Sequence, residues 1–280
     1  MHSTKNIVLT RSDKKSIILD TYYAAEINKQ PIVIFCHGYK GFKDWGAWDL
    51  MANKVSAAGY CFIKFNFSHN GGTMENPIDF PDLNAFGNNN YSKELEDLND
   101  VINWTQNHFL NNDLIDTSQI YLMGHSRGGG IAIIKAFEDI RVKKLIALAS
   151  VSDFSTRTYT IGNLKEWKEK GVKYVINGRT KQRMPHFFQF YEDFKANEKR
   201  LNIKSAVEQL SIPILIIHGD EDTSIALHEA ENLHNWNPKS QLEIIEGANH
   251  VFNTKHPWEK TSLSKELNKV AESTIKFLNK

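Results

Sequence analysis

The chain has 280 residues, a length that one α/β domain with an insertion commonly reaches. Its 34 Lys and Arg residues nearly balance its 33 Asp and Glu residues, which argues against nucleic acid as the main partner because phosphate binding needs a basic excess. Hydrophobic content of 41% with charged content of 24% excludes a globally disordered chain. No apolar run is long enough to span a membrane, and residues 1–15 lack the apolar core of a signal peptide. We therefore expect a cytoplasmic protein.

Short apolar runs alternate with helical patterns along most of the chain. The expected strands are, in chain order, 7–9, 16–23, 32–36, 61–67, 120–123, 145–149, 214–218 and 242–245. The expected helices are 49–58, the stretch from an N-cap at Ser92 to Phe109, 128–137, 228–235 and a last helix towards Leu278. This alternation predicts an α/β fold, a mostly parallel sheet with helices on both faces.

Residues 153–204 interrupt the alternation, because no convincing buried strand lies between Ser152 and Ser205. The stretch 154–204 holds nine aromatic residues, and twelve Lys and Arg against five Asp and Glu. Since a structureless loop of this length is unusual, we expect a small helical insertion over a core made of 1–152 and 205–280. It can be a lid over a pocket, with basic residues that attract anions, or a solvated insertion whose aromatic residues pack on the core.

The motif Gly124-His125-Ser126-Arg127-Gly128 follows an apolar strand and opens a predicted helix. A sharp strand-to-helix turn holds its apex residue in a strained conformation, and glycines are needed where the neighbouring chain leaves no room for a Cβ. At the apex, the Ser126 hydroxyl would project above the sheet edge at a helix N-terminus, where negative charge is favoured. The motif predicts Ser126 as a catalytic nucleophile; the alternative is a glycine-rich turn with an incidental serine.

Acyl transfer places negative charge on the carbonyl oxygen, which backbone N–H groups must stabilise. Arg127 directly follows the nucleophile and is expected to supply one such N–H. The buried strand 32–36 ends in His37-Gly38-Tyr39, where Gly38 permits close backbone approach and the N–H of Tyr39 is the expected second donor. We expect the His37 ring to brace this loop. The Tyr39 side chain can either contact substrate or cover the site.

A serine nucleophile needs a base, and the base needs an acid that orients it. His218-Gly219-Asp220-Glu221-Asp222 follows the strand 214–217, and Gly247-Ala248-Asn249-His250 follows the last strand. Both loops should lie at the carboxyl edge of the sheet, as Ser126 does. Because Ser, Asp and His in this chain order are typical of the architecture, we predict Asp222 as the acid and His250 as the base.

Three other residues compete for these roles. Asp220 and Asp153 are alternatives to Asp222, although Asp220 suits a turn-forming role. His69, in the loop 66–72, is an alternative base, against the reading that it is a loop histidine bonded to backbone.

Taken together, these motifs resemble the α/β-hydrolase fold over nearly the whole chain. The sequence is similar to small bacterial carboxylesterases of the cinnamoyl/feruloyl esterase type, which place a lid between strands six and seven. The resemblance implies Ser126 as nucleophile, His250 as base and Asp222 as acid. It implies the backbone N–H groups of Tyr39 and Arg127 as oxyanion donors.

The sequence departs from these relatives after the fourth strand. Many of them have an Asp-x-Arg-Gly loop where this chain has Asn66-Phe67-Ser68-His69-Asn70-Gly71-Gly72. In this fold the third and fourth strands are adjacent and parallel, so Cys36 at the end of one and Cys61 at the start of the other would be too far apart for a disulfide.

The sequence thus predicts a serine carboxylic ester hydrolase that acts on a small acyl or aryl ester through an acyl-enzyme. A thioesterase or peptidase with the same triad is the alternative, and a non-catalytic binding protein on this scaffold is a further one. We expect no cofactor and no metal, because no His, Cys or carboxylate cluster has ligand spacing and no nucleotide motif is present. The expected partner is a small-molecule ester, and homodimerisation stays open.

Overall fold

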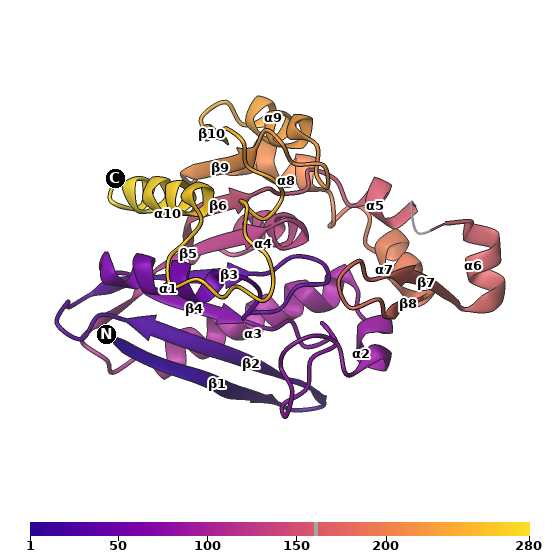
Figure 1. The fold of residues 1–280 in the computed structure, drawn as a ribbon, viewed down its shortest axis with the longest axis horizontal. Coiled ribbons are helices and arrows are strands. Elements are labelled where there is room, and N and C mark those ends of the chain that lie inside the picture. Colours follow the sequence, from indigo (N-terminus) through magenta and orange to yellow (C-terminus); the bar gives the residue numbers. More distant parts are fainter. Residues whose placement is uncertain (160–161) are drawn as a thin grey trace.

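The computed structural model describes residues 1–159 and 162–280, with the exception of the Tyr159 side chain. Residues 160–161 belong to the predicted insertion but lie outside the described residues. The strands of the central sheet are β1 (His2–Arg11), β2 (Lys14–Tyr23), β3 (Gln30–Cys36), β4 (Cys61–Phe65), β5 (Ile115–His125), β6 (Val142–Leu148), β9 (Ile214–Gly219) and β10 (Gln241–Ile245). Their spatial order is β1-β2-β4-β3-β5-β6-β9-β10 (Figure 1). β2 pairs antiparallel with both neighbours, and the strands from β4 to β10 run parallel, which confirms the mostly parallel sheet.

Helices cover both faces of this sheet, as the strand sequences require. Along β3, Ile32 and Ile34 face one buried cluster while Val33 and Phe35 face the other, so the strand is apolar on both sides. The first face is covered by α3 (Tyr91–His108), α4 (Arg127–Glu138), α8 (Ile203–Gln209) and α9 (Leu227–Trp236). The second face is covered by α1 (Trp48–Ala57) and α10 (Lys265–Leu278). None of the helices in the described part of the chain is long and apolar enough to cross a membrane.

The insertion is a mixed structure, so the expectation of a purely helical segment is wrong. It holds α5 (Ser155–Tyr159), α6 (Leu164–Lys170), β7 (Val172–Ile176), β8 (Arg183–Phe187) and α7 (Gln189–Ala196). β7 and β8 pair as a separate antiparallel hairpin. Figure 1 shows α6 and this hairpin beyond one end of the sheet, where β8 packs against α2 (Leu83–Gly87). The hairpin escaped sequence reasoning because its strands are five residues long and no residue of β7 is buried.

One helix start also differs from expectation, since Asn90 and not Ser92 caps α3. Asn90 has extended backbone, and its side-chain oxygen accepts a hydrogen bond from the Lys93 N–H at 2.9 Å. An Asn in that conformation satisfies one of the first N–H groups of the helix, which the helix itself cannot do. Helix α3 therefore begins at Tyr91, one residue before the predicted cap.

The two cysteines lie where the parallel pairing of β3 and β4 was expected to place them. Cys61 pairs with Ile32, and Cys36 pairs with Phe65, four residues further along each strand. At ~3.3 Å per residue this separation is beyond disulfide reach. Both thiols are free and buried, and burial raises the pKa of each.

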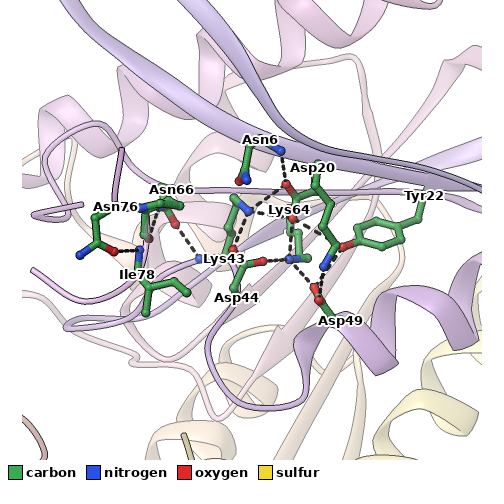
Figure 2. Close-up of polar contacts among 12 residues, drawn as sticks. Asn6, Asp20, Tyr22, Lys43, Asp44, Asp49, Lys64, Asn66, Asn76 and Ile78 are labelled. Carbon is green, nitrogen blue, oxygen red and sulfur yellow. Dashed lines mark hydrogen bonds and ion pairs between the residues drawn. The ribbon is translucent and has the colours of Figure 1, made fainter. Parts of the chain in front are cut away.

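A buried ion cluster fixes the loop that follows β3 (Figure 2). Lys43 Nζ lies 2.8 Å from an Asp20 oxygen and 2.6 Å from Asp44, while Lys64 Nζ lies 2.7 Å from Asp20 and 2.6 Å from Asp49. Both lysine side chains are fully buried. The two ammonium groups offset most of the charge of the three carboxylates and join β2, β4 and α1 to the loop. The same loop carries Tyr39 towards the sheet edge, so the cluster anchors one wall of the candidate site.

Candidate active site

Ser126 stands at the turn between β5 and α4 with φ 57° and ψ −122°, a strained conformation for a residue with a side chain. A Cβ on Gly128 would lie 2.4 Å from the carbonyl oxygens of Cys36 and His37, and one on Gly124 would lie 2.2 Å from the Gly128 oxygen. Both positions therefore require glycine. The turn is tight because α4 starts directly against the end of β3, which is the geometry the motif predicts.

The three predicted triad residues come together in hydrogen-bonding contact. The Ser126 Oγ lies 3.0 Å from His250 Nε2, and His250 Nδ1 lies 2.7 Å from Asp222 Oδ2. A carboxylate accepts hydrogen bonds, so Nδ1–H donates to Asp222 and Nε2 is left to accept from the serine hydroxyl. The His250 backbone is held as well, because its carbonyl oxygen accepts from His125 Nε2 at 2.8 Å. This arrangement suits proton transfer from Ser126 to His250.

Asp222 stays ionised in its buried position. Burial alone would raise its pKa, but hydrogen bonds from His218 and His250 and from the Ile225 N–H hold the pKa well below its usual range. The other oxygen, Oδ1, accepts from the N–H groups of Ser224 at 2.8 Å and Ile225 at 2.9 Å. A carboxylate held in this way can orient an imidazole and stabilise its protonated form.

The competing residues have other contacts. Asp220 accepts a hydrogen bond from the Gly247 N–H at 2.7 Å and so ties the Asp222 loop to the His250 loop. Asp153 accepts from Ser155 and Thr156 at the start of α5. His69 lies 2.8 Å from Ser68 Oγ, and His250 is the histidine that contacts Ser126. The geometry therefore favours Asp222 and His250 over their competitors.

The loop after β3 presents the Tyr39 N–H in a fixed direction. The Gly38 carbonyl accepts hydrogen bonds from His37 Nδ1 at 2.9 Å and from the Gly41 N–H at 3.0 Å. In a trans peptide the C=O and the following N–H point in opposite directions, so fixing the Gly38 oxygen also fixes the Tyr39 N–H. A Cβ on Gly38 would lie 2.9 Å from the Ser126 Cβ, which shows how closely this loop approaches the serine.

His37 braces this loop through both ring nitrogens, as expected from sequence. Its Nε2 accepts from the Phe67 N–H at 3.2 Å, which leaves the proton on Nδ1 to bind Gly38. Burial lowers the pKa of His37 to about 4, so the neutral ring that these two hydrogen bonds require persists at neutral pH.

The other expected donor, the backbone N–H of Arg127, is the first N–H group of α4. It has no acceptor within the helix and is therefore available to a ligand.

Ser126 and His250 open on two adjoining cavities. The larger, of about 420 Å³, is walled by Tyr39, Tyr91, Phe154, Phe190 and other side chains. The smaller, of about 220 Å³, lies against Trp45, Trp48 and Val251. The insertion contributes Phe154, Val175, His186 and Phe190 to the larger cavity and Asn177 and Arg179 to the smaller one. It therefore forms part of both walls around the serine.

Sequence reasoning placed the Tyr39 side chain at the site but missed the His186 ring and the Arg127 guanidinium, which complete the cavity wall beside Ser126. It also missed Glu94, which pairs with Arg127. The Arg127 guanidinium donates from Nε to Glu94 at 3.0 Å and lies over the Tyr91 ring at 4.5 Å. The Tyr39 hydroxyl donates to His186 Nε2 at 2.9 Å and thereby joins the loop after β3 to the hairpin. A signal for Glu94 existed, because it lies beside Leu95 and Leu98 in a helix whose apolar residues face the core. No local pattern marks His186.

Comparison with known families supports this architecture. Residues 19–237 match the BD-FAE family. Two curated relatives, both named "Uncharacterized 31.7 kDa protein in traX-finO intergenic region" from Escherichia coli, are 28% and 27% identical over 132 residues. The matched stretch is 45% of this chain and spans only 39% of the length of those relatives.

Solved structures share the fold over nearly the full length. Est1E from Butyrivibrio proteoclasticus has a TM-score of 0.72 at 15% identity, with 99% of this chain and 98% of that chain covered. A putative hydrolase from Agrobacterium vitis S4 has a TM-score of 0.71 at 19% identity, with 99% and 97% covered. Identities this low establish the fold alone, whereas the family match extends over most of the chain. The chain has the α/β-hydrolase fold and belongs to the BD-FAE family.

Proposed function

We propose that this protein hydrolyses a small acyl or aryl carboxylic ester by acyl transfer through Ser126. The observation that carries the proposal is the hydrogen-bonded chain from Ser126 through His250 to Asp222 at the floor of a cavity. The serine hydroxyl attacks the ester carbonyl carbon while His250 Nε2 takes its proton. The tetrahedral oxyanion that forms is stabilised by the N–H groups of Tyr39 and Arg127.

The same residues complete the second half of the reaction. His250 returns its proton to the leaving alkoxide as the carbon–oxygen bond breaks, which leaves the acyl group on Ser126. Water then attacks the acyl-enzyme, His250 takes the water proton, and the free acid and the serine hydroxyl are released. Asp222 stays ionised throughout and stabilises the imidazolium each time it forms.

We further propose that residues 153–204 act as a lid that shapes the substrate pocket. In support, this segment supplies part of the wall of each cavity, and its His186 is bonded to Tyr39. Several aromatic rings line the larger cavity, which favours an aryl or other apolar ester. Est1E, which shares the fold, has also been solved with ferulic acid bound, and methyl ferulate is therefore a suitable aryl probe.

Turnover of p-nitrophenyl acetate and methyl ferulate by wild type and Ser126→Ala tests the proposal. We expect Ser126→Ala to lower kcat by at least about 10³-fold, because the nucleophile is lost while binding groups remain. Ser118→Ala is a matched control, since that serine is exposed near the start of β5 and its hydroxyl donates a hydrogen bond to the neighbouring Asp116. Equal turnover by Ser126→Ala and wild type on both esters would refute the mechanism.

A further inference from the structure

The larger cavity beside Ser126 has a strongly cationic wall. Three basic side chains line it, Lys40, Arg127 and Arg157, and none of the described Asp or Glu residues does. Lys40 also lines the smaller cavity, so it borders both of the cavities on which Ser126 opens. The overall composition of the chain is nearly neutral, and this local excess is therefore a property of the site.

Two of these three cations form ion pairs with buried carboxylates that do not line the cavity. Arg127 pairs with Glu94, whose side chain is 6% exposed, and Arg157 pairs with Glu229, whose side chain is 9% exposed. Lys40 differs, because within residues 1–159 and 162–280 it forms no ion pair with a carboxylate. Its Nζ lies 5.0 Å from the centre of the Tyr39 ring. One positive charge in the wall is thus left without a counter-charge from the protein.

The pKa values and hydrogen bonding of the groups around the cavity reflect this excess of positive charge. Burial lowers the pKa of Lys40, which has no carboxylate to offset the loss of hydration. Burial, Arg127 and Lys40 together lower the pKa of His186 to about 4, so the ring stays neutral between them. Arg127 Nη2 is also buried without a hydrogen-bond partner in the described residues. An anion in the cavity would relieve each of these costs.

We propose that this cavity binds a carboxylate carried by the ester substrate, with Lys40 as the residue that selects for it. The inference rests on the proposed function, because it concerns which ester reaches Ser126. A carboxylate suits the site since it accepts a charge-assisted hydrogen bond from Lys40 while the rest of the substrate packs on the aromatic rings. The uncharged ester of the same size would leave the lysine desolvated and unpaired.

Matched pairs of esters with and without a carboxylate test this inference. The acyl side is probed with p-nitrophenyl monoadipate against p-nitrophenyl hexanoate, and the alcohol side with 4-acetoxybenzoate against its methyl ester. The measured quantity is the ratio of kcat/KM for the anionic ester to that for the neutral ester. We expect Lys40→Met to lower this ratio about tenfold in at least one pair, the size of one charge-assisted hydrogen bond.

Two further variants separate charge recognition from damage to the fold. Lys40→Arg keeps the charge and should restore most of the ratio. Lys168→Met removes an exposed lysine of the insertion that does not line the cavity, and the ratio should equal that of wild type. The wild-type ratio should also fall when salt is raised, since ions screen a partly exposed charge pair. A fold defect in Lys40→Met would instead lower kcat/KM for both esters of a pair together, and their ratio would stay at the wild-type value.

The outcomes distinguish this inference from the proposed function. Suppose that wild type hydrolyses the neutral esters, that each pair gives the same kcat/KM ratio in wild type and in Lys40→Met, and that the wild-type ratio does not change with salt. The carboxylate site is then refuted, while the proposed esterase function stands. If wild type hydrolyses no ester of either pair, the proposed function fails and the inference fails with it.

Discussion

Asp222 and Asp220 lie two residues apart, yet their surroundings give them different roles. Both oxygens of Asp222 accept hydrogen bonds, one of them from the His250 imidazole, and the side chain is buried. Asp220 is exposed and ties its loop to Gly247. The spacing of the sequence only favoured Asp222 as the acid that orients His250. At the scale of single residues, the hydrogen-bond partners distinguish it from Asp220.

Replacing each aspartate by asparagine tests this distinction. Asp222→Asn should lower kcat for p-nitrophenyl acetate by roughly 10⁴-fold, because an amide no longer holds His250 in the tautomer that accepts the serine proton. Asp220→Asn keeps an oxygen that can accept from Gly247 and should change kcat less than about threefold. Losses of equal size in the two variants would contradict the assignment of the acid.

The sequence predicted the proximity of the three proposed triad residues better than the pocket that surrounds them. Ser126, Asp222 and His250 each follow a strand, and parallel strands bring such positions to one edge. Lys40 and His186 became neighbours only through the packing of the hairpin against the loop after β3. A basic insertion over the pocket was one of the alternatives that the sequence offered. No periodicity reports a contact between segments nearly 150 residues apart, so the place of Lys40 in the cationic wall could not be anticipated.

At the scale of elements, the close approach of α4 to the end of β3 builds the site. It places Ser126 and the loop that carries Tyr39 side by side, and it leaves no room for a Cβ at Gly128. The alternation of apolar runs was enough to predict these elements and their parallel pairing. It was not enough for β7 and β8, since β7 is partly exposed throughout and neither strand borders the main sheet.

A pair of glycine variants measures the energy of this packing. Gly128→Ala should lower the free energy of unfolding by about 3 kcal/mol, because the added methyl group meets two backbone carbonyls that cannot move independently. Gly178→Ala is the control, since a Cβ there meets nothing within 4 Å, and its effect should stay within about 0.5 kcal/mol. Urea unfolding followed by circular dichroism gives both values. A Gly128→Ala protein as stable as Gly178→Ala would show that the turn is not tightly packed.

At the scale of the whole molecule, a buried ion cluster joins the antiparallel end of the sheet to the loop that carries part of the site. Lys64 on β4 contacts Asp20 on β2, Asp44 in the loop and Asp49 on α1. Lys64 and Asp20 are fully buried, so the charges depend on one another for compensation. Hydrophobic patterning did not reveal this cluster, because Lys64 sits inside an otherwise apolar strand that reads as core.

Replacing Lys64 measures how much the ion cluster contributes to the stability of the fold. Lys64→Met should lower the free energy of unfolding by about 3–5 kcal/mol, since it leaves the buried Asp20 and the neighbouring Asp44 to share Lys43 as their one remaining cation among the described residues. Lys170→Met, which removes an exposed lysine paired with Glu166, should leave the urea midpoint unchanged. Equal midpoints for Lys64→Met and Lys170→Met would mean that the cluster adds nothing to stability.

The central claim is that Ser126 is the nucleophile, and covalent labelling tests it most directly. The protein is treated with a fluorophosphonate, digested, and the modified residue is located by mass spectrometry, with Ser126→Ala and Asp222→Asn in parallel. The account predicts one label per chain on Ser126, no label on Ser126→Ala, and slower labelling of Asp222→Asn. Modification of another residue in wild type, or labelling of Ser126→Ala at the wild-type rate, would contradict it.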